Sequence, residues 1–129
     1  MTCSTEPAHP PADIETASDA YARRFEGPAG QWLLDRQTRI VLAWMRDLPC
    51  DAFLDVGGGH GQTALPLAEH GWHGTVTGSA PSCAERLNLD GAGERLTFQT
   101  APFLDLPYPD RSYSPVMCIR LLARCDEWP

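Results

Sequence analysis

The feature that most constrains this chain is a short apolar run that leads directly into a cluster of glycines. Residues 52–56 (AFLDV) are followed by residues 57–61 (GGGHG), where a helical pattern begins. The apolar run predicts a buried parallel strand. Glycines after such a strand let the backbone turn tightly and let a ligand approach without a Cβ atom in the way. In a doubly wound sheet, nucleotides bind at this first strand-to-helix turn.

The rest of the sequence alternates between helical and strand patterns. Apolar residues at helical spacing predict helices, and short apolar runs bounded by glycine or proline predict strands. The expected helices cover residues 18–25, 31–48, 61–70 and 82–89, with a further helical start in 121–128, and the expected strands cover residues 52–56, 74–78, 96–100 and 113–119. This alternation predicts an α/β fold, a Rossmann-like doubly wound parallel sheet that is truncated after about four strands.

Several finer expectations accompany this fold. The apolar face of helix 31–48 should pack on the sheet, and Trp32 and Trp44 are expected in the core. Ser82 and Glu85 form an S-x-x-E pattern that predicts a capping box. Residues 1–16 contain three prolines and are expected to be a flexible N-terminal leader, so the domain itself covers residues 17–129.

Composition and charge exclude several classes of partner. The formal net charge is −7 and the isoelectric point is near 4.9, so the surface repels nucleic acid and anionic lipid. No apolar stretch reaches 18 residues and no export signal is visible, so we expect a cytoplasmic protein without membrane association. The five cysteines follow no metal-ligand spacing and are expected to be free thiols, and no metal site is expected.

Two kinds of nucleotide site are compatible with a glycine-rich turn. A dinucleotide fingerprint requires G-x-G-x-x-G, with a pyrophosphate resting on the helix N-terminus. Starting from Gly57 and Gly59, its third glycine would be residue 62, which is Gln62. The chain instead has G-x-G-x-G, ending at Gly61, with Asp55 two residues ahead of the first glycine.

This second pattern resembles motif I of class I S-adenosylmethionine (SAM)-dependent methyltransferases of the type 11/25-like group. The resemblance extends over residues 18–129: segment 21–25 (YARRF) is similar to the helix that lies over the cofactor, and segment 106–113 (LPYPDRSY) is similar to the run that leads into the fourth strand. It covers the N-terminal half of such a domain. It implies that SAM is the cofactor and that Asp55 attracts its ammonium group. The residues it implies for cofactor binding are Asp55, Gly57, Gly58, Gly59, Gly61 and Tyr21.

The sequence also departs from the family pattern. Ala80 stands where an acidic residue would receive the ribose hydroxyls, and Pro102 stands where another would meet the adenine. Ser114 replaces the aspartate that opens the fourth strand, and the following Pro115 weakens a central strand. With no further strand beside it, that strand would be an exposed edge, which predicts an oligomer or a partner that pairs with it.

These observations favour a SAM-dependent methyltransferase, present as a truncated domain whose own activity is in question. The methyl acceptor is unidentified, and a small molecule is favoured over a macromolecule. One alternative is a non-catalytic Rossmann-like remnant or partner-binding module without SAM affinity. A weaker alternative is a fragment of an NAD(P)-binding oxidoreductase. No catalytic residue is predicted, because His60 is expected to serve the loop and the other histidines to lie on the surface.

Overall fold

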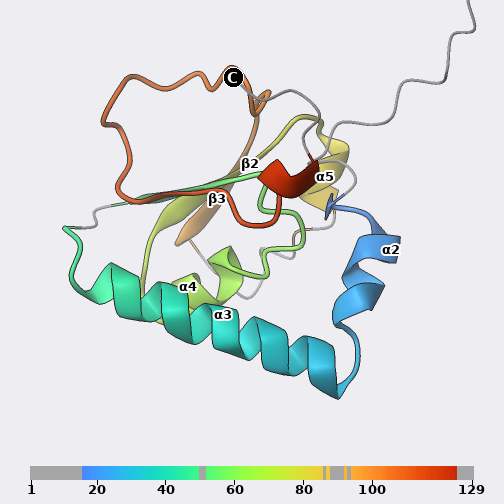
Figure 1. Ribbon diagram of the computed structural model, residues 1–129. Coiled ribbons are helices and arrows are strands. Elements are labelled where there is room, and N and C mark those ends of the chain that lie inside the picture. Colours follow the sequence, from blue (N-terminus) through green and yellow to red (C-terminus); the bar gives the residue numbers. More distant parts are fainter. Residues whose placement is uncertain (1–15, 50–51, 86, 88–91, 93, 125–129) are drawn as a thin grey trace, which may run out of the picture.

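The computed structural model describes residues 16–49, 52–85, 87, 92 and 94–124, and these form a parallel sheet with helices on one face (Figure 1). The strands are β1 (Phe53–Val56), β2 (Gly74–Gly78), β3 (Leu96–Thr100) and β4 (Val116–Met117). Their order is β3-β2-β1-β4, and every neighbouring pair is parallel. The predicted α/β fold with four parallel strands is therefore confirmed.

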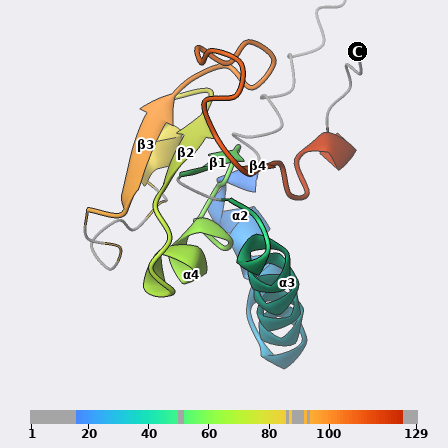
Figure 2. The same cartoon turned by 90° about the vertical axis from the view of Figure 1, so that its left-hand side faces the viewer.

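Strand β1 lies between β2 and β4, and all four of its residues are buried. Phe53 packs in a cluster with Val41 and Met45 of α3 (Pro28–Arg46) and with Leu67 of α4 (Ala64–Glu69). Leu54 and Val56 point to the opposite face, where Leu121 and the long segment after β3 cover them. Figure 2 shows α3 and α4 on one side of the sheet and this segment on the other.

Two helices begin at positions that proline explains. Helix α3 starts at Pro28, three residues earlier than predicted, because a proline at the first helical position loses no hydrogen bond. Helix α4 starts at Ala64 and not at Gly61, so Pro66 falls in the first turn, where its missing N–H needs no partner. The predicted helix 18–25 is confirmed as α2 (Asp19–Ala22) followed by a 3₁₀ turn, Arg23–Phe25.

Three local predictions need correction. Strand β4 is only two residues long, because Pro115 has no N–H to donate and the chain turns away after Met117. Helix α5 (Ser82–Glu85) contains Ser82 as its first residue, so Ser82 is not a residue that caps the helix from outside. The remaining predicted helix residues 86 and 88–89 lie outside the described part of the chain, as do residues 125–128 after the 3₁₀ turn Leu122–Arg124.

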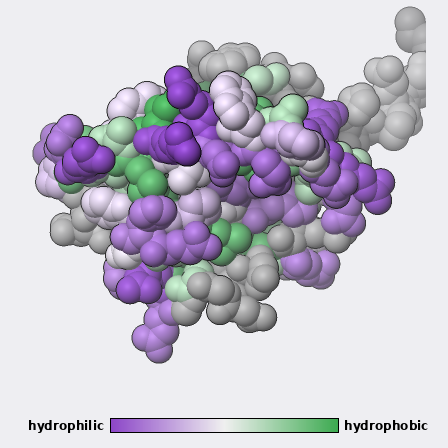
Figure 3. All heavy atoms as spheres, turned by 90° about the horizontal axis from the view of Figure 1, so that it is seen from below, coloured by the Kyte–Doolittle hydropathy of each residue, from purple (hydrophilic) through white to green (hydrophobic). Residues whose placement is uncertain are grey.

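The prediction that Trp32 and Trp44 belong to the core is wrong, since they are 65% and 69% exposed. Only one edge of the apolar face of α3 meets the sheet, through Val41 and Met45. The other edge (Leu33, Ile40 and Trp44) is exposed, as is Leu48 just after the helix. Viewed from the side of α3, the surface is mostly hydrophilic with small separate hydrophobic patches (Figure 3).

Two further findings concern the predicted leader and the possibility of a membrane-spanning helix. The predicted leader, residues 1–16, lies outside the described residues except for Thr16, which is buried. No helix among the described residues is long and apolar enough to cross a membrane.

The close contact between β1 and β2 limits the size of the side chain at position 74. A Cβ atom at Gly74 would overlap the ring of Phe53, which is fully buried. We expect Gly74→Ala to lower the free energy of unfolding by about 1–3 kcal/mol, as overpacked cores do. In a Phe53→Leu background the same substitution should cost less than half as much, measured by urea denaturation. Equal costs in both backgrounds would show that the ring is not the obstacle.

Candidate functional site

The glycine-rich loop adopts a backbone that other residues rarely tolerate. Gly57, Gly59 and Gly61 have φ angles of 65°, 57° and 75°, all in the left-handed region. The Gly57 N–H donates to the Thr77 carbonyl at 3.0 Å, which ties the loop to the end of β2. The Leu65 N–H donates to the Gly61 carbonyl at 2.9 Å, which begins the helical turn. The predicted strand–loop–helix arrangement therefore exists at this position.

Close packing supplies a second reason for glycine in this loop. A Cβ at Gly58 would lie 2.7 Å from Oδ2 of Asp55, and a Cβ at Gly59 would lie 2.9 Å from the Thr16 carbonyl oxygen. Gly61 differs, because a Cβ there would meet the side chains of Leu65 and Leu87. Gly61 thus serves helix packing, whereas Gly58 and Gly59 let the loop backbone pass close to the Asp55 carboxylate and the Thr16 carbonyl.

Asp55 is the buried charged group of this region. It is 2% exposed, and its Oδ2 has no hydrogen-bond partner among the described residues. Burial raises the pKa of Asp55 to about 7, against the opposing effect of the positive charge of Arg120. A buried acceptor without a donor destabilises a fold by about 1–3 kcal/mol, so it marks a place where a ligand could supply the donor.

The segment before α3 closes one side of the loop. The Ser18 hydroxyl caps α2 by accepting from the Tyr21 N–H at 3.2 Å. His60 Nε2 donates to the Ser18 carbonyl at 2.9 Å, so His60 serves as a tie between the loop and α2. Tyr21 is 7% exposed and packs against Phe25, with 5.4 Å between ring centroids.

Arg120 closes the other side, and the sequence analysis did not identify it. Its Nε donates to the Tyr21 hydroxyl at 3.1 Å, and its two terminal nitrogens donate to Gln37 Oε1 at 2.5 Å and Gln62 Oε1 at 2.7 Å. Its guanidinium lies 4.6 Å from the centroid of the Phe25 ring. Its position just beyond β4 could have indicated a site residue, since ligands bind at the carboxyl ends of parallel strands.

Together these residues surround a small hollow of about 20 Å³ that is open to solvent. Five of the six predicted binding residues line it: Tyr21, Asp55, Gly57, Gly58 and Gly59. Gly61 does not, for the packing reason given above. The other lining residues are Thr16, His60, Gln62, Thr63, Ile119 and Arg120.

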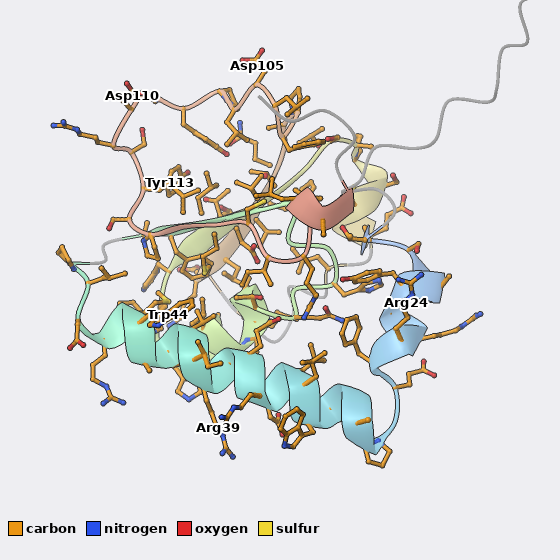
Figure 4. The ribbon with its side chains drawn as sticks, viewed as in Figure 1. Arg24, Arg39, Trp44, Asp105, Asp110 and Tyr113 are labelled. Carbon is orange, nitrogen blue, oxygen red and sulfur yellow. The ribbon has the colours of Figure 1, made fainter. Side chains whose placement is uncertain are left out.

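The acidic residues of the segment after β3 lie elsewhere. Asp105 and Asp110 are exposed and point outward from the upper loop, away from the glycine turn (Figure 4). Neither Ala80 nor Pro102 lines the hollow. Among the described residues, no three His, Cys, Asp or Glu side chains gather as a metal site would require.

Comparison with protein families decides the classification. The family model described as a methyltransferase domain matches residues 54–129, more than half of the 129 residues. The chain belongs to the methyltransferase domain family. No curated protein matches it.

The match places most of the hollow within the methyltransferase domain. It begins at Leu54 in β1, so it includes Asp55, the glycine loop and Arg120. Tyr21 and α3 precede the matched residues, yet hydrogen bonds from Arg120 to Tyr21 and Gln37 join them to the methyltransferase domain. The order β3-β2-β1-β4 places the glycine loop, which follows β1, at an inner strand of the sheet.

The buried carboxyl group makes stability depend on pH. The pKa of Asp55 is raised in the folded chain to about 7 from 3.8, so between these values the folded chain holds a proton that the unfolded chain releases. The free energy of unfolding therefore falls as pH rises from about 4 to about 7. We expect Asp55→Asn to be stabilising, by an amount that grows by about 3 kcal/mol between pH 5 and pH 8.

Urea denaturation of both chains across this pH range measures the effect. Asp105→Asn, which removes an exposed carboxylate, is the matched control and should follow the wild-type pH dependence. An Asp55→Asn chain with the wild-type pH dependence would contradict the assignment.

Proposed function

We propose that the hollow at the glycine loop binds SAM and that the chain takes part in methyl transfer from SAM to an acceptor. The observation that carries this proposal is the buried Asp55 carboxyl group, whose Oδ2 has no hydrogen-bond partner among the described residues and which lines a hollow that is open to solvent. Membership in the methyltransferase domain family supports the choice of cofactor.

The residues present fit the amino-acid end of SAM. Asp55, once ionised, would accept hydrogen bonds from an ammonium group in place of its missing partner. Gly58 and Gly59 line the hollow without side chains, and Tyr21 lines it from α2. When bound, SAM supplies a methyl group on a sulfonium, which needs an aligned nucleophile more than it needs an acid. The contribution of this chain would therefore be to hold the reactants in position.

The chain offers fewer contacts to the ribose and the adenine of SAM. Ala80 and Pro102 supply no carboxylate for the ribose hydroxyls or the adenine, so we expect a modest affinity. The net charge of −7 opposes an anionic acceptor such as nucleic acid. We therefore propose a small-molecule acceptor.

Gln62 counts against an NAD(P) site. It stands where a dinucleotide fingerprint has its third glycine, and its Oε1 accepts a hydrogen bond from Arg120. A long side chain that is fixed in this way occupies the place where glycine would allow close approach.

A titration of SAM into the purified chain tests the proposal. We expect a dissociation constant on the order of 10 μM, and at about 100 times that concentration SAM should add roughly 2.7 kcal/mol to the free energy of unfolding. Gly59→Ala should abolish binding, because its Cβ crowds the loop at Thr16.

Gly71→Ala is the matched control. Gly71 also has a positive φ, 93°, but a Cβ there meets nothing within 4 Å and the residue does not line the hollow. Both variants carry backbone strain, so loss of SAM binding in Gly59→Ala alone identifies the loop as the site. Equal loss in both, or no binding by the wild type, would refute the proposal.

The proposal also predicts a bell-shaped pH dependence. Below about 7, the pKa of Asp55, the carboxyl group is protonated and cannot pair with an ammonium. An α-amino group loses its charge above about 8. We therefore expect the tightest SAM binding between about pH 7 and pH 8, measured by titration from pH 5.5 to pH 9.5. Asp55→Asn should weaken binding and remove the acidic limb, whereas an unchanged acidic limb would assign that titration to another group.

The second candidate function is partner binding without SAM affinity. Val116 of the edge strand β4 is 57% exposed, and it lines an apolar groove with Trp44 of α3 and with Leu48, which follows α3. Uncovered strand edges of this kind pair with other chains. A folded chain that gives no heat with SAM but elutes as an oligomer would favour this function over the first.

A further inference from the structure

Arg120 adopts a backbone conformation that is uncommon for a long side chain. Its φ angle is 60°, in the left-handed region, which costs a residue other than glycine on the order of 1 kcal/mol. Such strain persists only where surrounding contacts impose it, and it is concentrated at functional sites. The contacts that hold Arg120 are three hydrogen bonds and the face of the Phe25 ring.

All three acceptors of these hydrogen bonds are neutral. They are the hydroxyl of Tyr21 and the amide oxygens of Gln37 and Gln62. None of the contacts of Arg120 within the described residues is an ion pair with a carboxylate. A guanidinium has five N–H groups, so one on each terminal nitrogen is left for a further acceptor. Arg120 is therefore a half-buried cation, fixed in orientation, with donors to spare.

The opposite charge lies on the same hollow. Both Arg120 and Asp55 line it, and each has hydrogen-bonding capacity that the described residues do not use. The positive charge of Arg120 favours the ionised form of Asp55 but does not pair with it directly. A hollow with one anionic and one cationic wall complements a ligand that carries both charges on one carbon atom.

We propose that Arg120 binds the carboxylate of an α-amino acid group while Asp55 binds its ammonium, so that the hollow selects the amino-acid end of SAM as a zwitterion. This inference rests on the proposed function. A planar guanidinium matches a carboxylate in a fork geometry that lysine cannot reproduce. Tyr21, Gln37 and Gln62 act as positioning residues, because they fix the direction in which the free N–H groups point.

The test compares SAM with decarboxylated SAM, which keeps the ammonium and lacks only the carboxylate. In isothermal titrations we expect the wild-type chain to bind SAM about 10- to 100-fold more tightly, as a charge-assisted hydrogen bond allows. Arg120→Gln should reduce this ratio to within about twofold, because SAM loses its carboxylate partner, whereas any change at Asp55 affects the ammonium groups of both ligands alike. Arg120→Lys should leave an intermediate ratio.

Arg111→Gln is the matched control. Arg111 is also an arginine with a positive φ, 63°, but it is exposed and does not line the hollow. It should keep the wild-type ratio, so strain relief and loss of one positive charge are both controlled.

Each remaining outcome is decisive. A wild-type chain that binds both ligands equally overturns this inference and leaves the proposed function standing. An Arg120→Gln chain that keeps the wild-type ratio overturns it as well. If Arg120→Gln does not fold, an Arg120→Lys chain with the full wild-type ratio does the same. A wild-type chain that binds neither ligand overturns the proposed function and this inference together.

Discussion

The burial of one carboxyl group beneath a turn of glycines is the constraint on which the rest of this structure depends. Asp55 belongs to the central strand, so its position is set by pairing with β2 and β4 on either side. The loop can pass this close to its carboxyl group only because Gly58 has no side chain. Fold and site are therefore not separable here, since a residue of the central strand also carries the oxygen atom that has no hydrogen-bond partner among the described residues.

Arg120 gives the hollow its second wall and joins segments that are distant in sequence. Its three acceptors come from α2, from α3 and from the residue after the glycine loop. A ligand bound between Asp55 and Arg120 would therefore be linked through one hydrogen bond to α2, to α3 and to the residue after the glycine loop.

Much of the fold and part of the site follow from the sequence. The strands β1, β2 and β3 were predictable because short apolar runs end in glycine or proline, and the loop because its glycines alternate. The position of α4 and the two-residue length of β4 were not, since each depends on where a proline falls relative to hydrogen bonds made elsewhere. Exposure of Trp44 was also unpredictable, because helical spacing shows which residues share a face and not how much of that face a sheet covers.

The same limit applies to the site. Residues near the glycine motif could be assigned by position, whereas Arg120 lies 65 residues after Asp55 and only the strand order brings the two to one hollow. The role of Gln37 could not be predicted for a related reason, since the sequence around a polar residue in an amphipathic helix does not indicate which residues it contacts.

Gln37 has a consequence for how this hollow could change its ligand. Its amide nitrogen donates to the Thr63 hydroxyl at 2.9 Å while its amide oxygen accepts from Arg120, so the orientation of the amide is fixed. A glutamate at this position would keep both contacts, because a hydroxyl can donate as well as accept. It would also provide Arg120 with an internal counter-ion. A single nucleotide substitution of a CAA or CAG codon to GAA or GAG would then turn a site suited to zwitterions into one suited to amines.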